Sequence, residues 1–376
     1  MSKYILIIIS FFLLFCPVEV VAISAPLAVP NNKFGIHILS PDEIELAAKL
    51  VNSSGGDWGY ATIPIQAPDR DLEKWQKFMD KAKELHIIPI IRLTTLPISE
   101  NWQKPDDFDL VDFGNFLNSL DWPIKNRYLI IYNEVNRASE WGGELNPEAY
   151  AFFLNKAIDI LKSKSPDFFI LNAGLDGAAP NNHVLMDEYT YLKRMEAAVP
   201  GIFQKLDGWN SHSYPNPDFS AKPYENRRNT IYGFRYELSF LGQYGVNSKP
   251  VFITETGWRK DGITPVTIGK FYEQAFNAVW SDKNIVAITP FLLTAGAGPF
   301  EKFSFTDGGG NPLDHFIKYV SIPKIAGKPK LAPIAKNLTI NHNQNNNLSK
   351  VASEGFFLDT LPYFWKNILK YLFWEK

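Results

Sequence analysis

Two glutamates stand at the ends of apolar segments that have the composition of buried β-strands. Glu134 lies near the end of YLIIYNEV at 128–135, and Glu255 lies near the end of PVFITET at 250–256. The carboxyl ends of parallel strands are the places where barrel enzymes keep their active sites. Two carboxyl groups can cleave a glycosidic bond, because one protonates the leaving oxygen while the other attacks the sugar or activates water. A single such glutamate could equally form a salt bridge or cap a helix, but two favour catalysis.

The segments that must position these glutamates follow a regular pattern. From residue 34 onward, short apolar runs alternate with longer segments of helical periodicity, which is typical of βα units. Two helical segments have clear apolar stripes, formed by Leu72, Trp75, Met79, Ala82 and Leu85 and by Tyr150, Phe153, Leu154, Ala157 and Leu161. The predicted strands span residues 34–39, 58–65, 87–93, 128–135, 168–175, 206–214, 250–256 and 285–293.

Eight βα units predict an α/β protein with a closed (β/α)8 (TIM) barrel, a single catalytic domain over residues 30–325. An open doubly wound sheet usually has a glycine-rich phosphate turn after an early strand, and the sequence contains neither GxGxxG nor GxxxxGK[ST]. In an eight-stranded barrel the fourth and seventh strands lie on roughly opposite sides of the mouth. Glu134 and Glu255 are therefore expected to flank one bond of a substrate.

Other polar side chains lie in the predicted strands and are candidates for the same site. His212 and Tyr214 share one face of the sixth strand, because strand side chains alternate, so both can point into the mouth. Arg92, near the end of the third strand, could pair with Glu255 and lower its pKa, or could stitch together the barrel floor. His37 in the first strand is a weaker candidate.

Aromatic residues make up 14% of the chain, with 10 Trp and 16 Tyr, and sugar-binding clefts are one use for such an excess. Trp258 and Trp141 follow predicted strand ends, where their flat faces could stack on pyranose rings. The other interpretation is that these side chains belong to the core.

Three motifs together resemble the retaining (β/α)8-barrel glycoside hydrolases of the cellulase, mannanase and β-xylosidase type. They are Asn133-Glu134 in the fourth strand, His212-Ser213-Tyr214 in the sixth and Thr254-Glu255-Thr256-Gly257-Trp258 at the seventh. The resemblance covers about residues 34–320. It implies that Glu134 is the general acid/base, that Glu255 is the nucleophile, and that Asn133 donates to the sugar 2-hydroxyl. It also implies that Tyr214 donates a hydrogen bond that keeps the nucleophile ionised.

The sequence departs from this family at two places. Such enzymes often have proline directly after Asn-Glu, where this chain has Val135. Many have tryptophan at the end of the eighth strand, where this chain has Phe291. These departures bear on the subfamily and on the sugar platform more than on the reaction.

Composition and missing motifs exclude several other classes of function. Lys and Arg number 38 against 40 Asp and Glu, so the chain lacks the basic footprint of a nucleic-acid-binding protein. The six histidines are dispersed and neither HExxH nor a calcium loop occurs, so we predict no metal and no cofactor. The absence of GxSxG argues against a serine hydrolase.

The expected partner is a polysaccharide or oligosaccharide, and two alternatives to a hydrolase remain. A transglycosylase would use the same two glutamates but intercept the intermediate with a sugar. A catalytically silent barrel could bind polysaccharide at the cell surface, although a binding cleft has no need for an acid and a nucleophile. The sequence does not distinguish the sugar, or endo from exo action.

The two ends of the chain have compositions of their own. Residues 1–22 have the order of a secretory signal peptide, so we expect export, and cleavage would remove Cys16, the single cysteine. An uncleaved anchor is the alternative. Residues 326–350 are rich in Lys, Pro and Asn, which predicts a surface strap or linker. Residues 351–376 predict an amphipathic helix that docks on its own domain or a second copy, or binds weakly to a membrane.

Overall fold

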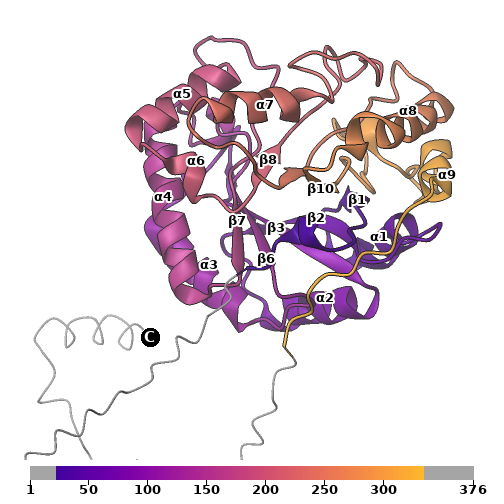
Figure 1. Cartoon of the computed structure of the whole chain (residues 1–376), viewed down its shortest axis with the longest axis horizontal. Helices are drawn as coiled ribbons and strands as arrows, with labels where there is room; N and C mark the ends of the chain where they lie inside the picture. Colours follow the sequence, from indigo (N-terminus) through magenta and orange to yellow (C-terminus); the bar gives the residue numbers. More distant parts are fainter. Residues whose placement is uncertain (1–22, 334–376) are drawn as a thin grey trace, which may run out of the picture. The chain divides into compact units, whose positions relative to one another are not determined.

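The computed structural model describes residues 23–333, and they form a (β/α)8 barrel. All eight predicted strands are present, and the helices form a ring around them (Figure 1). The barrel strands are β1 (Gly35–His37), β2 (Gly59–Gln66), β3 (Ile87–Thr94), β6 (Arg127–Ile131), β7 (Phe168–Leu171), β8 (Trp209–Ser211), β9 (Val251–Ile253) and β10 (Ile285–Ile288). A short hairpin that the sequence analysis did not predict, β4 (Pro97–Ile98) with β5 (Asn101–Trp102), follows β3.

The strands pair in parallel in the order β1-β2-β3-β6-β7 and β10-β9-β8. Single bridges join these two groups at both seams. Phe34 pairs with Ile288 between the first and last strands, and Asp176 pairs with His212 just beyond β7 and β8. The order of the strands around the barrel is therefore their order in the sequence. It places the ends of β6 and β9, the fourth and seventh barrel strands, across the mouth from each other.

The helices surround the sheet because each has one apolar face. They are α1 (Ile44–Val51), α2 (Leu72–Glu84), α3 (Asp107–Ser119), α4 (Pro147–Lys164), α5 (Glu188–Ala198), α6 (Ile202–Lys205), α7 (Gly233–Gly242), α8 (Pro265–Asn277) and α9 (Asp314–Ser321). The stripe predicted on α4 is fully buried, whereas on α2 the first member, Leu72, is exposed. Asp71 and Asn146 accept hydrogen bonds from the first turns of α2 and α4, which fixes where these helices begin.

Strand alternation separates the core into two layers. Alternate side chains of each strand point outward and pack against the helices. The side chains between them point inward and form a cluster that fills the barrel, including Tyr60, Ile90, Tyr128, Phe169 and Phe252. On β3, Ile90 and Arg92 both point inward, and Arg92 lies closer to the mouth, beyond the apolar cluster.

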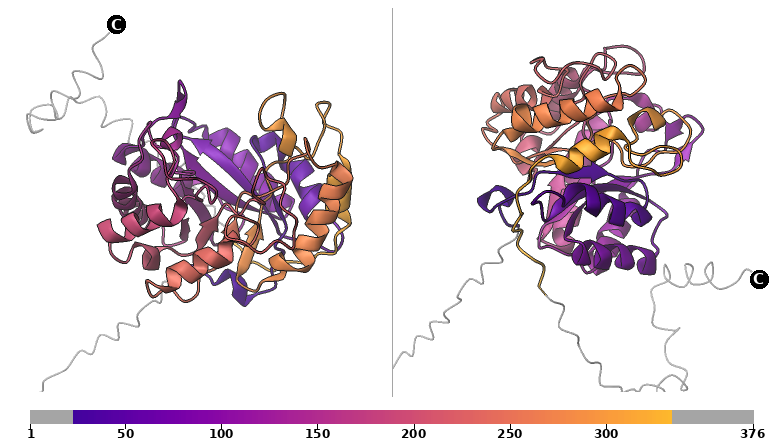
Figure 2. Two further views of the ribbon diagram at one scale, coloured as in Figure 1. Left: turned by 90° about the horizontal axis from the view of Figure 1, so that it is seen from above. Right: turned by 90° about the vertical axis from the view of Figure 1, so that its right-hand side faces the viewer.

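The beginning of the predicted strap crosses the N-terminal end of the barrel. Ala326 bridges to Asp57 and Leu331 bridges to Ile124. The right-hand view of Figure 2 shows this yellow segment passing along the indigo part of the chain. The predicted signal peptide, residues 334–350 of the strap and the predicted terminal helix lie outside the described residues. No helix among residues 23–333 is long and apolar enough to span a membrane.

Candidate active site

A cavity of about 820 Å³ opens at the C-terminal ends of the strands, as the sequence analysis predicted. It is lined by Arg92, Asn133, Glu134, His212, Tyr214 and Glu255, together with aromatic and polar residues of the loops. Six of the nine predicted site residues therefore meet in one cavity, although they come from β3 and from the segments that follow β6, β8 and β9.

Glu255 follows β9 and is held by groups from β3 and from the segment after β8. Arg92 on β3 donates a hydrogen bond to Oε1, and the Tyr214 hydroxyl donates to Oε2 at 3.1 Å. His212 Nδ1 lies 3.7 Å from Oε2. Burial by itself would raise the pKa of Glu255, but His212 and Arg92 outweigh it and lower that pKa to about 2. Glu255 is therefore ionised across the neutral range, as a nucleophile must be.

Glu134 sits on a strained turn directly after β6. Tyr132 and Glu134 have positive φ values of 67° and 29°, which are uncommon for side chains of this size. The Glu134 amide donates to the Gly174 carbonyl at 2.9 Å, and this bond holds the turn against the end of β7. The turn directs the Glu134 carboxyl into the cavity instead of toward the helices.

The electrostatic surroundings of Glu134 differ from those of Glu255. Its Oε1 lies 3.2 Å from His212 Nδ1, and its Oε2 lies 3.7 Å from the Arg137 guanidinium. Burial raises the pKa of Glu134, the hydrogen bond with His212 opposes that rise, and the negative charge of Glu255 adds to it. The two glutamates therefore have pKa values shifted in opposite directions, as an acid and a nucleophile require.

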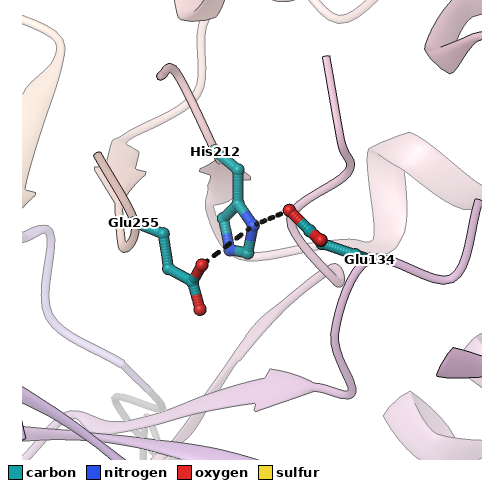
Figure 3. A group of neighbouring side chains, drawn as sticks. All are labelled: Glu134, His212 and Glu255. Carbon is teal, nitrogen blue, oxygen red and sulfur yellow. Dashed lines mark hydrogen bonds and ion pairs between the residues drawn. The ribbon is translucent and has the colours of Figure 1, made fainter. Parts of the chain in front are cut away.

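The two carboxyl groups are close enough to act on one bond. An oxygen of Glu134, an oxygen of Glu255 and Nδ1 of His212 all lie within 4.8 Å of one another. Figure 3 shows the glutamates on either side of the His212 ring. Burial would lower the pKa of His212, but the charges of Glu255 and Glu134 overcome it and raise that pKa, so the ring favours its protonated form. The imidazolium is thus placed to screen the two carboxylates from each other.

Three such side chains could in principle hold a metal ion. The residues around them do not suit a cation, however. Arg92 donates to Glu255 from one side, and the negative charges of both carboxylates favour the protonated form of His212. Fixed positive charge already neutralises the pair, so the arrangement fits proton transfer better than metal binding.

Asn133 and His37 contact the site through different neighbours. The Arg92 guanidinium, which donates to Glu255, also donates to Asn133 Oδ1 at 2.9 Å. Arg92 therefore links Asn133 to Glu255. His37 Nε2 lies 3.9 Å from Glu255 Oε1, and burial, reinforced by the charge of Arg92, lowers the pKa of His37 to about 3. His37 is therefore a neutral, buried side chain next to Glu255, and it does not belong to the cavity lining.

Comparison with known proteins shows which solved structures have a similar fold. No family model and no curated protein matches the sequence. Solved structures do match, at low identity. The chain superposes on a family 39 glycoside hydrolase from the gut symbiont Bacteroides cellulosilyticus WH2 with a TM-score of 0.55 and 12% identity, over 79% of this chain and 64% of that one. It therefore spans just under two thirds of that relative's length.

Two further matches have similar scores. One is an endo-β-1,3-glucanase of glycoside hydrolase family 128 (subgroup II) from Sorangium cellulosum, with a TM-score of 0.53 and 14% identity over 77% of this chain and 98% of that one. The other is a glucosidase from Croceicoccus marinus, with a TM-score of 0.56 and 12% identity over 78% of this chain and 68% of that one. The chain has the fold of the (β/α)8-barrel glycoside hydrolases. The predicted fold class is thereby confirmed.

The two predicted tryptophan platforms do not line the cavity. Trp258 is 2% exposed, packs against Tyr272 and Trp280, and donates its Nε1–H to the Ala221 carbonyl. Trp141 is 1% exposed. The prediction that these rings stack on sugars is therefore wrong. The chain turns back toward the helices after each strand end, so both rings are buried in the core.

The aromatic residues that do line the cavity come from other parts of the chain, including helix α2 and strand β5. They are Trp75, Trp102, Tyr132, Tyr214, Phe219, Phe291, Phe300 and Phe303. Trp102 stands on the unpredicted β4–β5 hairpin, and Phe291 occupies the strand-eight position at which many members of the resembled family have tryptophan. Arg137, Glu140 and Asp176 also line the cavity, although none was predicted. Their closeness in sequence to Glu134 or to the end of the fifth predicted strand was the one signal that could have found them.

Tyr214→Phe tests the hydrogen bond to the candidate nucleophile. Burial raises the pKa of the Tyr214 hydroxyl, so the hydroxyl keeps its proton and remains a donor. A hydrogen bond to a charged group contributes about 1.5–3 kcal/mol, so we expect kcat/KM for any substrate to fall on the order of 10- to 100-fold. Because the lost bond favours the ionised form, the pKa of Glu255 should rise and the acid limb of the pH profile should move to higher pH. An unchanged profile would contradict this role.

Proposed function

We propose that the protein is a retaining glycoside hydrolase that cleaves O-glycosidic bonds of a β-linked glycan by double displacement. The observation that carries the proposal is the close approach of Glu134 and Glu255, whose carboxylate oxygens lie within 4.8 Å of each other. Retaining enzymes hold their two carboxyl groups about 5–5.5 Å apart, whereas inverting enzymes leave about 6.5–9.5 Å for a water molecule. The short separation favours direct attack by a carboxylate.

In the first step, Glu255 attacks the anomeric carbon while Glu134 protonates the departing oxygen. The bond between sugar and leaving group breaks, and an ester forms between the sugar and Glu255. The ester removes the negative charge of Glu255, so the pKa of Glu134 falls and the carboxylate that remains can act as a base. Glu134 then takes a proton from water, whose oxygen attacks the anomeric carbon and releases Glu255. Two inversions give overall retention.

Arg92, Tyr214 and Asn133 have supporting roles in this proposal. Arg92 and Tyr214 orient the nucleophile and keep it ionised through their hydrogen bonds to its two oxygens. Asn133 is held by Arg92 beside the acid/base, where it would contact the hydroxyl next to the anomeric carbon. This contact strengthens as the oxocarbenium-like transition state develops.

The test is to incubate the protein with a panel of 2-fluoro-β-glycosides of glucose, xylose, mannose and galactose. Their fluorine slows hydrolysis of the glycosyl-enzyme, so a covalent adduct should accumulate. Intact mass and peptide sequencing should locate it on Glu255, and the reactive member of the panel would name the sugar. An adduct on another residue would overturn the assignment.

Product analysis then separates hydrolysis from transfer to a second sugar, since both pass through the same adduct. Binding of polysaccharide without any adduct or product would favour the silent barrel instead. Export through residues 1–22 remains part of the proposal, and detection of the protein in the exported fraction would support it.

A further inference from the structure

A third carboxyl group lines the cavity beside the candidate catalytic pair. Glu140 is the last residue of the short helix η3 (Ala138–Glu140), six positions after Glu134. Its side chain is partly buried, and no ion pair among residues 23–333 includes it. Arg92 and Arg137 act on this carboxyl group through space, but neither forms an ion pair with it. Partial burial of a carboxyl group without a direct partner is costly, so its place in the cavity needs another explanation.

The backbone and the neighbouring tryptophan fix the direction of Glu140. Two successive turns bring the chain back over the mouth, with Arg137 N–H donating to the Glu134 carbonyl at 2.8 Å and Glu140 N–H donating to the Arg137 carbonyl at 3.0 Å. Trp141 is anchored in the core between the rings of Tyr132 and Tyr150. Because Trp141 points into the core, the residue before it is left facing the cavity.

Glu140 also belongs to a chain of polar contacts that begins at the nucleophile. Arg92 donates to both Glu255 and Asn133 Oδ1, and Asn133 and Glu140 both line the cavity. The oxygen of the amide faces Arg92, and the Asn133 side chain lies close enough to Glu140 to lower the pKa of its carboxyl group. The carboxyl group therefore lies at the same wall as the residue expected to contact the sugar.

The charges around Glu140 decide how much of it is protonated. Burial raises the pKa of Glu140 to about 7, the negative charges of Glu134 and Glu255 add to the rise, and Arg92 and Asn133 oppose it. Lys104, which follows the β4–β5 hairpin, forms its ion pair with Glu144 at 2.9 Å and not with Glu140. A neutral carboxyl group has one O–H to donate, and the Asn133 amide, itself a donor, does not use it.

We propose that Glu140 is a substrate-binding residue whose carboxyl group donates a hydrogen bond to a hydroxyl of the sugar held beside Asn133. This inference rests on the proposed function, because it requires a glycan in the cavity. Hydrogen bonding by Glu140 predicts a pH effect on substrate binding that Glu134 and Glu255 alone do not predict. Substrate affinity should fall as the pH rises through neutrality, when the O–H is lost and a negative charge faces the hydroxyl.

The experiment measures binding in the full chain with Glu134→Gln, which stops turnover and removes the titration of the acid/base. Affinities for cellohexaose, laminarihexaose, xylohexaose and mannohexaose are measured by calorimetry at pH 5 and pH 9. We expect the hexasaccharide that binds at pH 5 to have an affinity about tenfold lower at pH 9, since one hydrogen bond is lost. Adding Glu140→Gln should abolish the difference, because its amide donates at both pH values.

Glu144→Gln in the same background is the matched control. Glu144 is an exposed carboxylate in the same loop, paired with Lys104, so this variant should keep the tenfold pH effect. Equal affinities at both pH values with Glu140 present, or an unchanged pH effect after Glu140→Gln, would overturn the inference while leaving the proposed function intact. If no hexasaccharide binds and the wild-type protein forms no adduct, the proposed function fails and the inference fails with it.

Discussion

Glu255→Ala should lower kcat for a β-glycoside on the order of 10⁴-fold or more, because no covalent intermediate can then form. The cavity should remain in place, since the alanine removes a side chain held by Arg92 and Tyr214 without disturbing the backbone of β9. Azide, a small anion, can enter the space that the carboxylate leaves. It would attack the anomeric carbon from the same face as the missing nucleophile and give the α-glycosyl azide. Product stereochemistry by NMR is the measurement.

Glu134→Ala should give a different signature from the same assay. General acid catalysis contributes about 10²- to 10⁴-fold, so natural substrates should lose that factor. A dinitrophenyl leaving group needs no proton, so the glycosyl-enzyme should still form and then accumulate as a burst. Azide would attack this intermediate from the opposite face and give the β-glycosyl azide. The pair of opposite azide products would assign the two roles independently of any rate.

Glu144→Ala serves as the control for both variants, because its exposed carboxylate lies outside the cavity lining. It should retain wild-type kcat and KM. Near-normal activity in either Glu134→Ala or Glu255→Ala would show that the assigned pair is not the catalytic pair. Identical azide products from the two variants would contradict the double-displacement mechanism.

Much of this architecture follows from local features of the sequence. Most barrel strands are apolar runs bounded by polar residues, and burial on both faces makes such runs stand out, whereas β8 has the sequence Trp-Asn-Ser. Alternation along a strand also predicts direction, which is why His212 and Tyr214 were expected in the mouth, and both are found there. For Arg92 the sequence left two places open, the mouth and the barrel floor, and the structure places it in the mouth. Glu134 and Glu255 were recognisable because a carboxylate that closes a buried strand is rare without a partner.

The loops were less predictable because tertiary packing decides which way each side chain turns. Trp141 and Trp258 follow strand ends, yet the chain reverses there and buries both rings. Glu140 lines the cavity next to the buried Trp141, and its closeness to Glu134 in the sequence is the one signal that points to this place. The β4–β5 hairpin that presents Trp102 has strands of two residues each, too short to show a period.

A prediction about stability arises where β7 meets the site, at Gly174. A Cβ atom at this position would lie 2.1 Å from Cδ2 and 2.4 Å from Nε2 of His212, far inside van der Waals contact. The His212 side chain is 1% exposed and contacts both Glu134 and Glu255, so moving it aside would break those contacts. The Gly174 carbonyl also accepts the hydrogen bond from the Glu134 amide. Glycine is therefore required here by the close approach of the imidazole ring.

Gly174→Ala should lower the free energy of unfolding by about 1–3 kcal/mol, the usual cost of overpacking a filled site. It should also reduce kcat strongly, because displacement of His212 breaks its contacts with Glu134 and Glu255. Thermal unfolding and steady-state kinetics measure the two effects. Gly242→Ala at the end of α7 is the control, since a Cβ there meets no atom within 4 Å, and it should leave both quantities nearly unchanged.

The double variant Gly174→Ala/His212→Ala decides whether the clash is the cause. Removing the ring creates room for the added methyl group, so the double variant should be no less stable than His212→Ala alone. Its activity should stay as low as that of His212→Ala, because the imidazolium between the two carboxylates is still missing. If Gly174→Ala costs no stability once His212 is absent, and lowers activity no further than His212→Ala does, the two positions are coupled. Gly174 would then affect catalysis only through the position of His212. Additive losses of stability would instead place the cost in the backbone of the β7 turn.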